Sequence, residues 1–318
     1  LVMKVTEHLA KADKTLLSLE ILPPLKGKSI HGIYDVLDHL VEFKPSFINV
    51  TYHRSEYIYK KRGDDRFDKV FIRKRPGTES ICAAIMNKYN VDTVPHLICG
   101  GFSVGETEDA LINLNYLGID NVLVLRGDAA KNEGVFEPEP DGHPYAINLL
   151  EQVTNLNAGI YIEEDLKNTS RTKFCIGVAG YPEKHFEAPN MDTDLRYLKA
   201  KVDAGADYIV TQMFFDNQKY FGFVEACRSI GINVPIIPGL KPVYSKKQLT
   251  ILPKTFHIDL PTELSEAVLA CKSDEEVEQV GAEWLLMQSR ELKKAGVPVL
   301  HYYTLGRPQL VADVVAKL

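Results

Sequence analysis

The feature of this sequence that most constrains its fold is a repeated alternation of short apolar runs with longer segments of helical periodicity. The predicted strands are residues 16–22, 47–51, 94–98, 122–125, 174–178, 208–212, 235–237 and 299–303. The predicted helices between them are residues 30–43, 80–89, 105–117, 146–153, 193–204 and 218–230. Strands that alternate with helices in this number predict an α/β protein, a single (β/α)8 TIM barrel domain over residues 1–318.

Two segments interrupt the regular alternation. The connection between the seventh and eighth strands is longer than a crossover requires, and two extra helices are predicted there, at residues 263–271 and 275–294. The segment 53–76 is rich in charge and predicts an exposed loop or hairpin.

The charge of the chain argues against several classes of partner. Its formal net charge is −6, whereas a nucleic-acid binder needs clustered Lys and Arg. No uninterrupted apolar run reaches the roughly twenty residues of a membrane span, and no signal peptide is visible. Five cysteines without a Cys-x-x-Cys pair indicate reduced thiols. We therefore expect a cytoplasmic protein without a nucleic-acid or membrane partner.

Polar residues recur where the predicted strands end. In a barrel of this type the chemistry lies at the rim formed by the carboxyl ends of the strands. A buried polar group without a partner costs roughly 1–3 kcal/mol, so packing alone does not explain such a recurrence. The residues at these ends are Glu20, Thr51, His96, Arg126, Gly127, Asp128, Tyr181, His185, Gln212, His301 and Thr304.

A series of motifs, each at a predicted strand or helix and in chain order, resembles the methylenetetrahydrofolate reductase family. The series is Leu19-Glu20-Ile21-Leu22-Pro23-Pro24, Val50-Thr51-Tyr52, Pro95-His96-Leu97-Ile98-Cys99, Leu125-Arg126-Gly127-Asp128, Gly177-Val178-Ala179-Gly180-Tyr181-Pro182-Glu183-Lys184-His185, Lys201-Val202-Asp203-Ala204-Gly205-Ala206, Thr211-Gln212-Met213-Phe214-Phe215-Asp216, Pro238-Gly239-Leu240 and His301-Tyr302-Tyr303-Thr304-Leu305. The resemblance is to the stand-alone, bacterial type of catalytic chain. His53-Arg54-Ser55 departs from the small residues that many members carry there, and the loop that follows is longer than in compact members.

The resemblance implies an oxidoreductase that contains FAD. NADH or NADPH would reduce the flavin, and the flavin would pass the hydride to methylenetetrahydrofolate in a ping-pong cycle that yields methyltetrahydrofolate. The sequence does not distinguish NADH from NADPH, because no ribose-reading motif is present. The resemblance further implies a small-molecule substrate and a homo-oligomer.

The two candidate catalytic residues are carboxylates. Opening of the methylene bridge requires a proton on the departing nitrogen, so a general acid is needed. Glu20 lies among leucines and isoleucine, and an apolar setting favours the protonated form of a carboxyl group. Asp128 would stabilise the cationic substrate intermediate by opposite charge. The structural alternatives are an ion-paired Glu20 and a turn or N-cap Asp128, with Arg126 as the ion-pair partner of Asp128.

Further contacts are implied by the resemblance. The substrate contacts are Glu20, Asp128, Gln212, Phe214, Leu252 and Arg307, with Arg307 at the acidic tail of the folate. Core packing is the alternative for Phe214 and Leu252. The FAD contacts are Thr51, His96, Leu125, Arg126, Gly127, Asp128, Tyr145, Ala146, Tyr181, His185, Asp194 and Lys201. For Lys201 a solvated helix face is the alternative.

Two other classes of barrel enzyme are alternatives to a flavin-dependent reductase. A Schiff-base aldolase needs a lysine on an inner strand face, and the predicted strands offer only Lys173, at the wrong end. A pterin-binding methyltransferase-type barrel would bind folate without flavin.

The pair His96 and Cys99 is too small a set for a metal site, so no metal is expected. No Gly-x-Gly-x-x-Gly follows a strand, which removes the Rossmann route to a dinucleotide.

Overall fold

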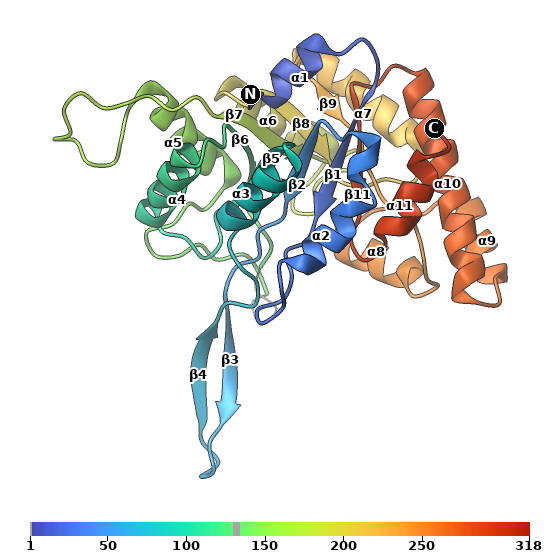
Figure 1. Ribbon diagram of the computed structural model, residues 1–318, viewed down its shortest axis with the longest axis horizontal. Coiled ribbons are helices and arrows are strands. Elements are labelled where there is room, and N and C mark those ends of the chain that lie inside the picture. Colours follow the sequence, from blue (N-terminus) through green and yellow to red (C-terminus); the bar gives the residue numbers. More distant parts are fainter. Residues whose placement is uncertain (1, 130–133) are drawn as a thin grey trace.

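The computed structural model describes residues 2–129 and 134–318, and its centre is a barrel of parallel strands (Figure 1). The barrel strands are β1 (Leu16–Ile21), β2 (Phe47–Val50), β5 (Asp92–Ile98), β6 (Asn121–Leu125), β7 (Cys175–Gly180), β8 (Tyr208–Thr211), β9 (Ile236–Ile237), β10 (Gly239–Leu240) and β11 (Val299–Tyr303). They pair in the order β10-β11-β1-β2-β5-β6-β7-β8-β9. This arrangement confirms the predicted TIM barrel.

The seventh strand of the barrel is split in two by a proline. Only Pro238 separates β9 from β10, and proline has no N–H to donate to a neighbouring strand. Its carbonyl still accepts from the backbone N–H of His301 at 3.1 Å. Since β9 pairs with β8 and β10 pairs with β11, the two short strands together close the sheet.

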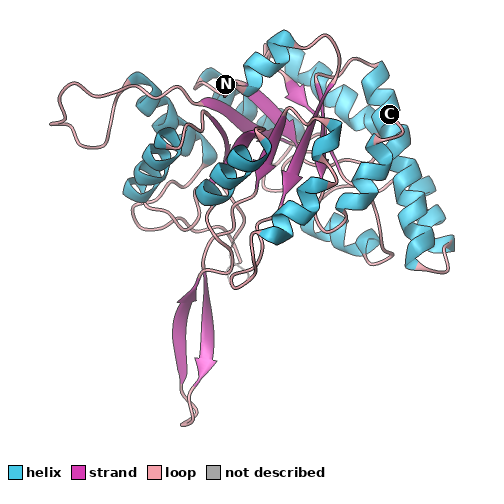
Figure 2. Cartoon of the chain, in the orientation of Figure 1, coloured by secondary structure: helices cyan, strands magenta, loops and turns pink. Residues whose placement is uncertain are grey.

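Helices surround the barrel, as the sequence predicts (Figure 2). They are α1 (Val5–Lys11), α2 (His31–Asp38), α3 (Thr78–Tyr89), α4 (Val104–Tyr116), α5 (Ala146–Ala158), α6 (Met191–Asp203), α7 (Asn217–Ser229), α8 (Gln248–Phe256), α9 (Thr262–Ala270), α10 (Asp274–Lys294) and α11 (Pro308–Val315), with a 3-10 turn at Val41–Phe43. The extra helices between the seventh and eighth strands are α8, α9 and α10. The sequence analysis did not predict α1, α8 or α11, and it ended α5 too early.

The first helix closes the end of the barrel where the strands begin. Val5 of α1 is fully buried against the inner residues of the strands, and its N–H donates to Oδ1 of Asn121 at 2.8 Å. His8 Nε2 lies 2.6 Å from a carboxylate oxygen of Asp92. Side chains therefore fill this end of the barrel.

The segment 53–76 forms an antiparallel hairpin of β3 (Glu56–Lys61) and β4 (Phe67–Ile72). It projects from the rim where the strands end, away from the barrel and its helices (Figures 1 and 2). The base of the hairpin is tied to the rim, because the Lys26 N–H donates to the Lys74 carbonyl at 2.7 Å and Arg75 donates to the Pro23 carbonyl. The predicted exposed loop or hairpin is therefore a hairpin.

Candidate active site

Strand alternation brings a polar cluster to the inside of the barrel mouth. Ser18 and Glu20 come from β1. The strands on either side contribute His301 from β11 and Asn49 from β2, and His96 comes from β5, which pairs with β2. Each of these side chains is buried, with Glu20 only 7% exposed. The Glu20 Oε2 atom lies 3.4 Å from His96 Nε2 and 3.7 Å from His301 Nε2. The candidate general acid is thus held between two imidazoles.

The surroundings of Glu20 differ from the apolar setting that the sequence suggested. Leu19 and Ile21 flank Glu20 in the chain, but successive side chains of a strand point to opposite faces. Both pack in the cluster outside the barrel, against the helices. The inner neighbours of Glu20 are polar, and the Thr304 hydroxyl also donates to the Glu20 carbonyl at 2.7 Å.

The two histidines at the mouth have different partners. Burial lowers the pKa of His96 to about 4, against the opposing charge of Glu20, so His96 is neutral near pH 7. Its Nε2 atom lies 3.3 Å from Nδ2 of Asn49. His301 hydrogen-bonds Ser18 Oγ through Nδ1 at 2.8 Å, whereas its Nε2 has no hydrogen-bond partner among the described residues. That nitrogen faces the Glu20 carboxylate, 3.7 Å from its Oε2 atom.

Lys241 is a site residue that the sequence analysis missed. It directly follows β10, it is 5% exposed, and burial lowers its pKa to about 8, with the charge of Glu20 opposing this shift. No lysine lies within a described strand of the barrel, but Lys241 reaches the mouth from just beyond β10. Lys173 is exposed beside Asp120 at the far end, but Lys241 lies at the mouth. The sequence feature that could have identified this lysine is the Pro238-Gly239-Leu240 motif, because Lys241 directly follows it.

An aromatic ring connects Lys241 to the outer rim. The ammonium of Lys241 lies 4.9 Å from the ring centroid of Tyr244, and the guanidinium of Arg307 lies 5.0 Å from the same centroid. Arg307 is exposed and pairs with Glu278 at 2.8 Å. Two cations thus contact one ring, and the outer cation is the predicted contact for the acidic folate tail.

Predicted flavin residues gather on the other side of the mouth, after β6 and β7. Arg126 donates to both carboxylate oxygens of Glu187, at 2.5 and 2.7 Å, so its partner is Glu187 and not Asp128. The Tyr181 and His185 rings meet edge to face at 4.7 Å. The His185 N–H donates to the Asp194 carboxylate at 2.8 Å, which fixes the loop to α6.

Lys201 points inward from α6 and does not lie on a solvated face. Its Nζ atom donates to the Ala179 carbonyl on β7 at 3.2 Å. Burial lowers the pKa of this lysine to about 8, against the charge of Asp194. An ammonium group has three donors, so donors remain for an anionic ligand.

The other predicted site residues lie at the rim, on exposed loops or in the core. Thr51 hydrogen-bonds His53 at 3.2 Å, and Gln212 accepts from the Met213 N–H at 2.9 Å. Phe214 is fully buried and stacks on Tyr220 of α7, in the layer outside the barrel. Leu125 and Gly127 are partly exposed at the rim, and Asp128 and Tyr145 are exposed. Ala146 begins α5, and Leu252 is buried in the cluster formed with α8.

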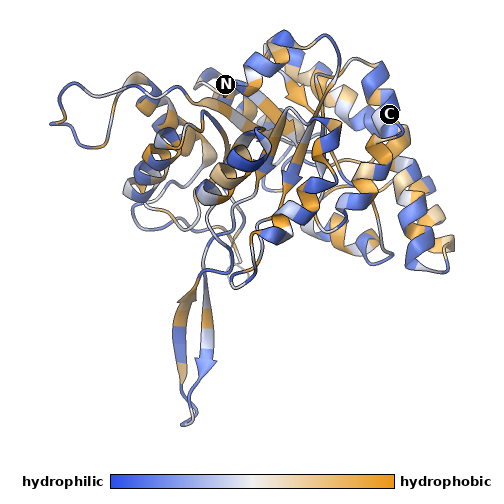
Figure 3. Cartoon of the chain, in the orientation of Figure 1, coloured by the Kyte–Doolittle hydropathy of each residue, from blue (hydrophilic) through white to orange (hydrophobic). Residues whose placement is uncertain are grey.

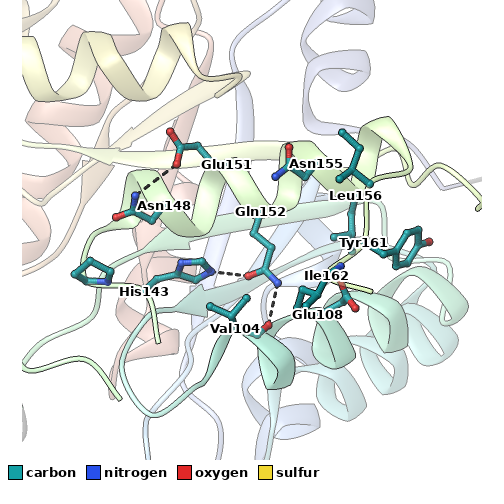
Figure 4. Close-up of a pocket in the computed structure, with 12 residues that line it drawn as sticks. Val104, Glu108, His143, Asn148, Glu151, Gln152, Asn155, Leu156, Tyr161 and Ile162 are labelled. Carbon is teal, nitrogen blue, oxygen red and sulfur yellow. Dashed lines mark hydrogen bonds between the residues drawn. The ribbon is translucent and has the colours of Figure 1, made fainter. Parts of the chain in front are cut away.

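A cavity of about 450 Å³ lies outside the barrel, between α4 and α5 (Figure 4). Its central polar groups are paired with each other: His143 Nε2 lies 2.5 Å from Gln152 Oε1, and Gln152 donates to the Val104 carbonyl at 2.9 Å. None of the predicted catalytic residues lines it. Within the described parts of the chain, no group of three or more His, Cys, Asp or Glu could hold a metal ion, and no helix could span a membrane.

Comparison with known proteins identifies the family of the chain. The sequence model of the family described as methylenetetrahydrofolate reductase matches residues 4–318. The chain belongs to the methylenetetrahydrofolate reductase family. The 5,10-methylenetetrahydrofolate reductase of Escherichia coli is 30% identical over 294 residues, which cover 92% of this chain and 87% of that protein.

Other relatives of this methylenetetrahydrofolate reductase family member are longer. "Methylenetetrahydrofolate reductase (NADH) 1" of Arabidopsis thaliana is 32% identical over 99% of this chain but only 51% of its own length. The chain spans about half the length of the eukaryotic relatives it matches. Among solved structures, a Clostridium thermocellum protein described as binding two copies of 5-methyl-5,6,7,8-tetrahydrofolic acid has a TM-score of 0.56 at 14% identity, over 98% of both chains. That likeness concerns the fold.

Proposed function

We propose that this protein reduces 5,10-methylenetetrahydrofolate to 5-methyltetrahydrofolate, with FAD as cofactor and NADH or NADPH as the hydride donor. In this proposal the two half-reactions follow a ping-pong order in one catalytic barrel domain. The observation that carries the proposal is the buried Glu20 carboxylate between His96 and His301. Membership of the family supports the substrate, and relatives named for NADH and for NADPH support a nicotinamide donor.

Glu20 has the position that a proton donor to the folate needs. It lies at the open end of the barrel, where only a ligand in the mouth can reach it, and it is shielded from bulk water. His96 next to it is neutral near pH 7, and the positive charge of Lys241 faces Glu20 in the mouth. We infer that Glu20 protonates the departing nitrogen of the methylene bridge and that Asp128, in the open at the rim, stabilises the resulting cation.

The residues after β6 and β7 fit a flavin. Their donor set combines a guanidinium at Arg126, an ammonium at Lys201 and the backbone at Gly127, whose φ of +85° turns the chain at the rim. Such donors suit ring carbonyls and a diphosphate. When bound, FAD would supply hydride transfer between nicotinamide and folate. The full proposed set is Thr51, His96, Leu125, Arg126, Gly127, Asp128, Tyr145, Ala146, Tyr181, His185, Asp194 and Lys201.

The folate would extend from Glu20 towards Arg307. Gln212 offers its amide to the pterin edge, while Arg307 would meet the carboxylates of the tail. Because Phe214 is completely buried against Tyr220, and Leu252 is buried in the cluster with α8, we assign them to the wall behind the substrate.

An anaerobic half-reaction assay tests the proposal. NADH or NADPH should bleach the flavin absorbance of the purified protein, and methylenetetrahydrofolate should then restore it. Glu20→Gln should bleach normally but recover at least about 100-fold more slowly, since general acid catalysis contributes about 10²–10⁴-fold. Glu225→Gln, an exposed carboxylate on α7, is the matched control. A protein that neither contains nor binds FAD would refute the proposal and leave a pterin-binding methyltransferase-type barrel.

A further inference from the structure

The projecting hairpin, which we call the arm (residues 56–75), has one face composed of aromatic and basic side chains. In its register Tyr57 opposes Phe71, Tyr59 opposes Lys69 and Lys61 opposes Phe67. Alternation along each strand therefore places four aromatic rings and two lysines, and no carboxylate, on the same face. The rings of Tyr57 and Phe71 are 5.1 Å apart, and the four aromatic residues are between 47% and 61% exposed.

The arm lacks a core of its own. An isolated two-stranded hairpin is at best marginally stable in water, because it has no second layer on which to bury its side chains. Its apolar side chains lie on both faces, since Ile58 opposes Val70 on the other side, and Figure 3 colours parts of both strands as hydrophobic. An exposed apolar surface of this kind is typical of a protein contact site.

The charge of the arm is opposite to that of the rest of the chain. Residues 56–75 contain eight Lys or Arg and four Asp or Glu, a formal charge of +4. Since the whole chain carries −6, the remainder carries −10. Two arms would repel each other, whereas the arm of one copy is attracted to the body of another.

The body offers a complementary surface at the cavity between α4 and α5 (Figure 4). Its apolar lining includes Ile160 and Ile162, which are 57% and 48% exposed. Acidic residues stand in and beside it: Glu108 and Glu151 in the lining, and Glu163, Glu164 and Asp165 in the exposed segment that follows. An apolar groove with an acidic rim complements a face of aromatic rings and lysines in polarity and in charge.

We propose that the arm of one copy docks its aromatic face into the α4–α5 groove of a second copy, and that the second copy returns the same contact. Such a reciprocal exchange closes a two-fold dimer. Lys61 and Lys69 would then lie over the acidic residues 163–165. The inference does not depend on the proposed reaction.

The dimer is tested by sedimentation velocity over a range of protein concentrations. The wild-type chain should be a dimer, and Tyr57→Ser combined with Phe71→Ser should raise the dissociation constant at least about tenfold, as expected for buried aromatic anchors. Leu269→Ser, which removes an equally exposed apolar side chain on α9, should leave it unchanged. If the double variant misfolds, a chain with residues 57–71 replaced by a short Gly-Ser linker should be a folded monomer.

A charge swap tests the location of the contact. Lys61→Glu with Lys69→Glu should weaken the dimer, as should Glu163→Lys with Glu164→Lys, and all four changes together should restore it. Failure of this rescue would overturn docking at the α4–α5 groove. A monomeric wild-type chain, or a dimer indifferent to every arm variant, would overturn the proposal altogether. So would a monomer that co-sediments with anionic vesicles through its arm, which would mark a membrane contact.

Discussion

The buried ammonium of Lys241 is stabilised by the carboxylate of Glu20, which opposes the lowering of the Lys241 pKa by burial. The two residues reach the barrel mouth from different strands, Glu20 from the end of β1 and Lys241 just after β10. Protonated Lys241 therefore places a positive charge opposite Glu20 in the mouth. That charge is lost as the pH rises through about 8, the pKa of Lys241.

Removing that charge should change the pH dependence of the folate half-reaction. In the wild-type chain the rate of flavin recovery should change as the pH rises through about 8, where Lys241 loses its proton, and this change should be absent in Lys241→Met. His96, His301 and Tyr303, which also face Glu20, are left in place. The measurement is stopped-flow recovery of flavin absorbance between pH 5 and pH 9.

The control for this profile is Lys254→Met, which removes an exposed lysine from α8. Its profile should match that of the wild-type chain. A Lys241→Met profile that still changes near pH 8 would show that Lys241 does not cause that change.

The same lysine should make stability depend on pH in alkaline solution. Its pKa is about 8 in the folded protein and near 10.5 when unfolded, so the unfolded chain binds more protons between these values. The free energy of unfolding of the wild-type chain therefore rises from pH 8 to pH 10.5 relative to that of Lys241→Met, which lacks the titrating amine. Urea unfolding should show the difference in free energy between the two proteins changing by about 2 kcal/mol over this range. Parallel curves would contradict the burial of a charged lysine.

The sequence predicted the barrel and the position of Glu20 but not its electrostatic surroundings. Strand periodicity identifies which residues share a face, whereas the neighbours across the barrel depend on pairing between distant strands. Leu19 and Ile21 suggested an apolar setting because they are adjacent in the chain, yet they point outward. Lys241 was missed because Pro238 ended the predicted strand, although the strand resumes as β10.

The arm shows a different limit of sequence reasoning. Its charges predicted exposure, and exposure is confirmed at Tyr59 and Phe67. The alternation of aromatic residues along both strands was hidden by the charged residues between them. Which residues oppose each other follows from the turn register, and that register requires the structure.

Replacing Gly281 of α10 with alanine should destabilise the fold, because this glycine packs against backbone atoms. A Cβ at Gly281 would fall on the carbonyl oxygen of Val243, a backbone atom two residues after Lys241. Gly281→Ala should lower the free energy of unfolding by about 2 kcal/mol or more, as overpacking of a buried contact does. Gly222→Ala on α7, where nothing lies within 4 Å of the added Cβ, should instead stabilise by up to about 1 kcal/mol. Thermal or urea unfolding of the two variants measures both, and a stabilised Gly281→Ala would contradict this packing.

The last prediction separates binding of the folate tail from chemistry. Arg307 is exposed at the rim, with its guanidinium over Tyr244 and paired with Glu278, so it can exchange that partner for a ligand carboxylate. A hydrogen bond to a charged group contributes about 1.5–3 kcal/mol, which corresponds to at least about a tenfold change in affinity. Arg307→Ala should therefore raise the KM for methylenetetrahydrofolate about tenfold, while bleaching by the nicotinamide stays unchanged. Arg290→Ala, which removes an exposed arginine that donates to the Lys317 carbonyl, is the control. A variant that lost bleaching as well would show that Arg307 supports the fold of the mouth and does not bind the tail.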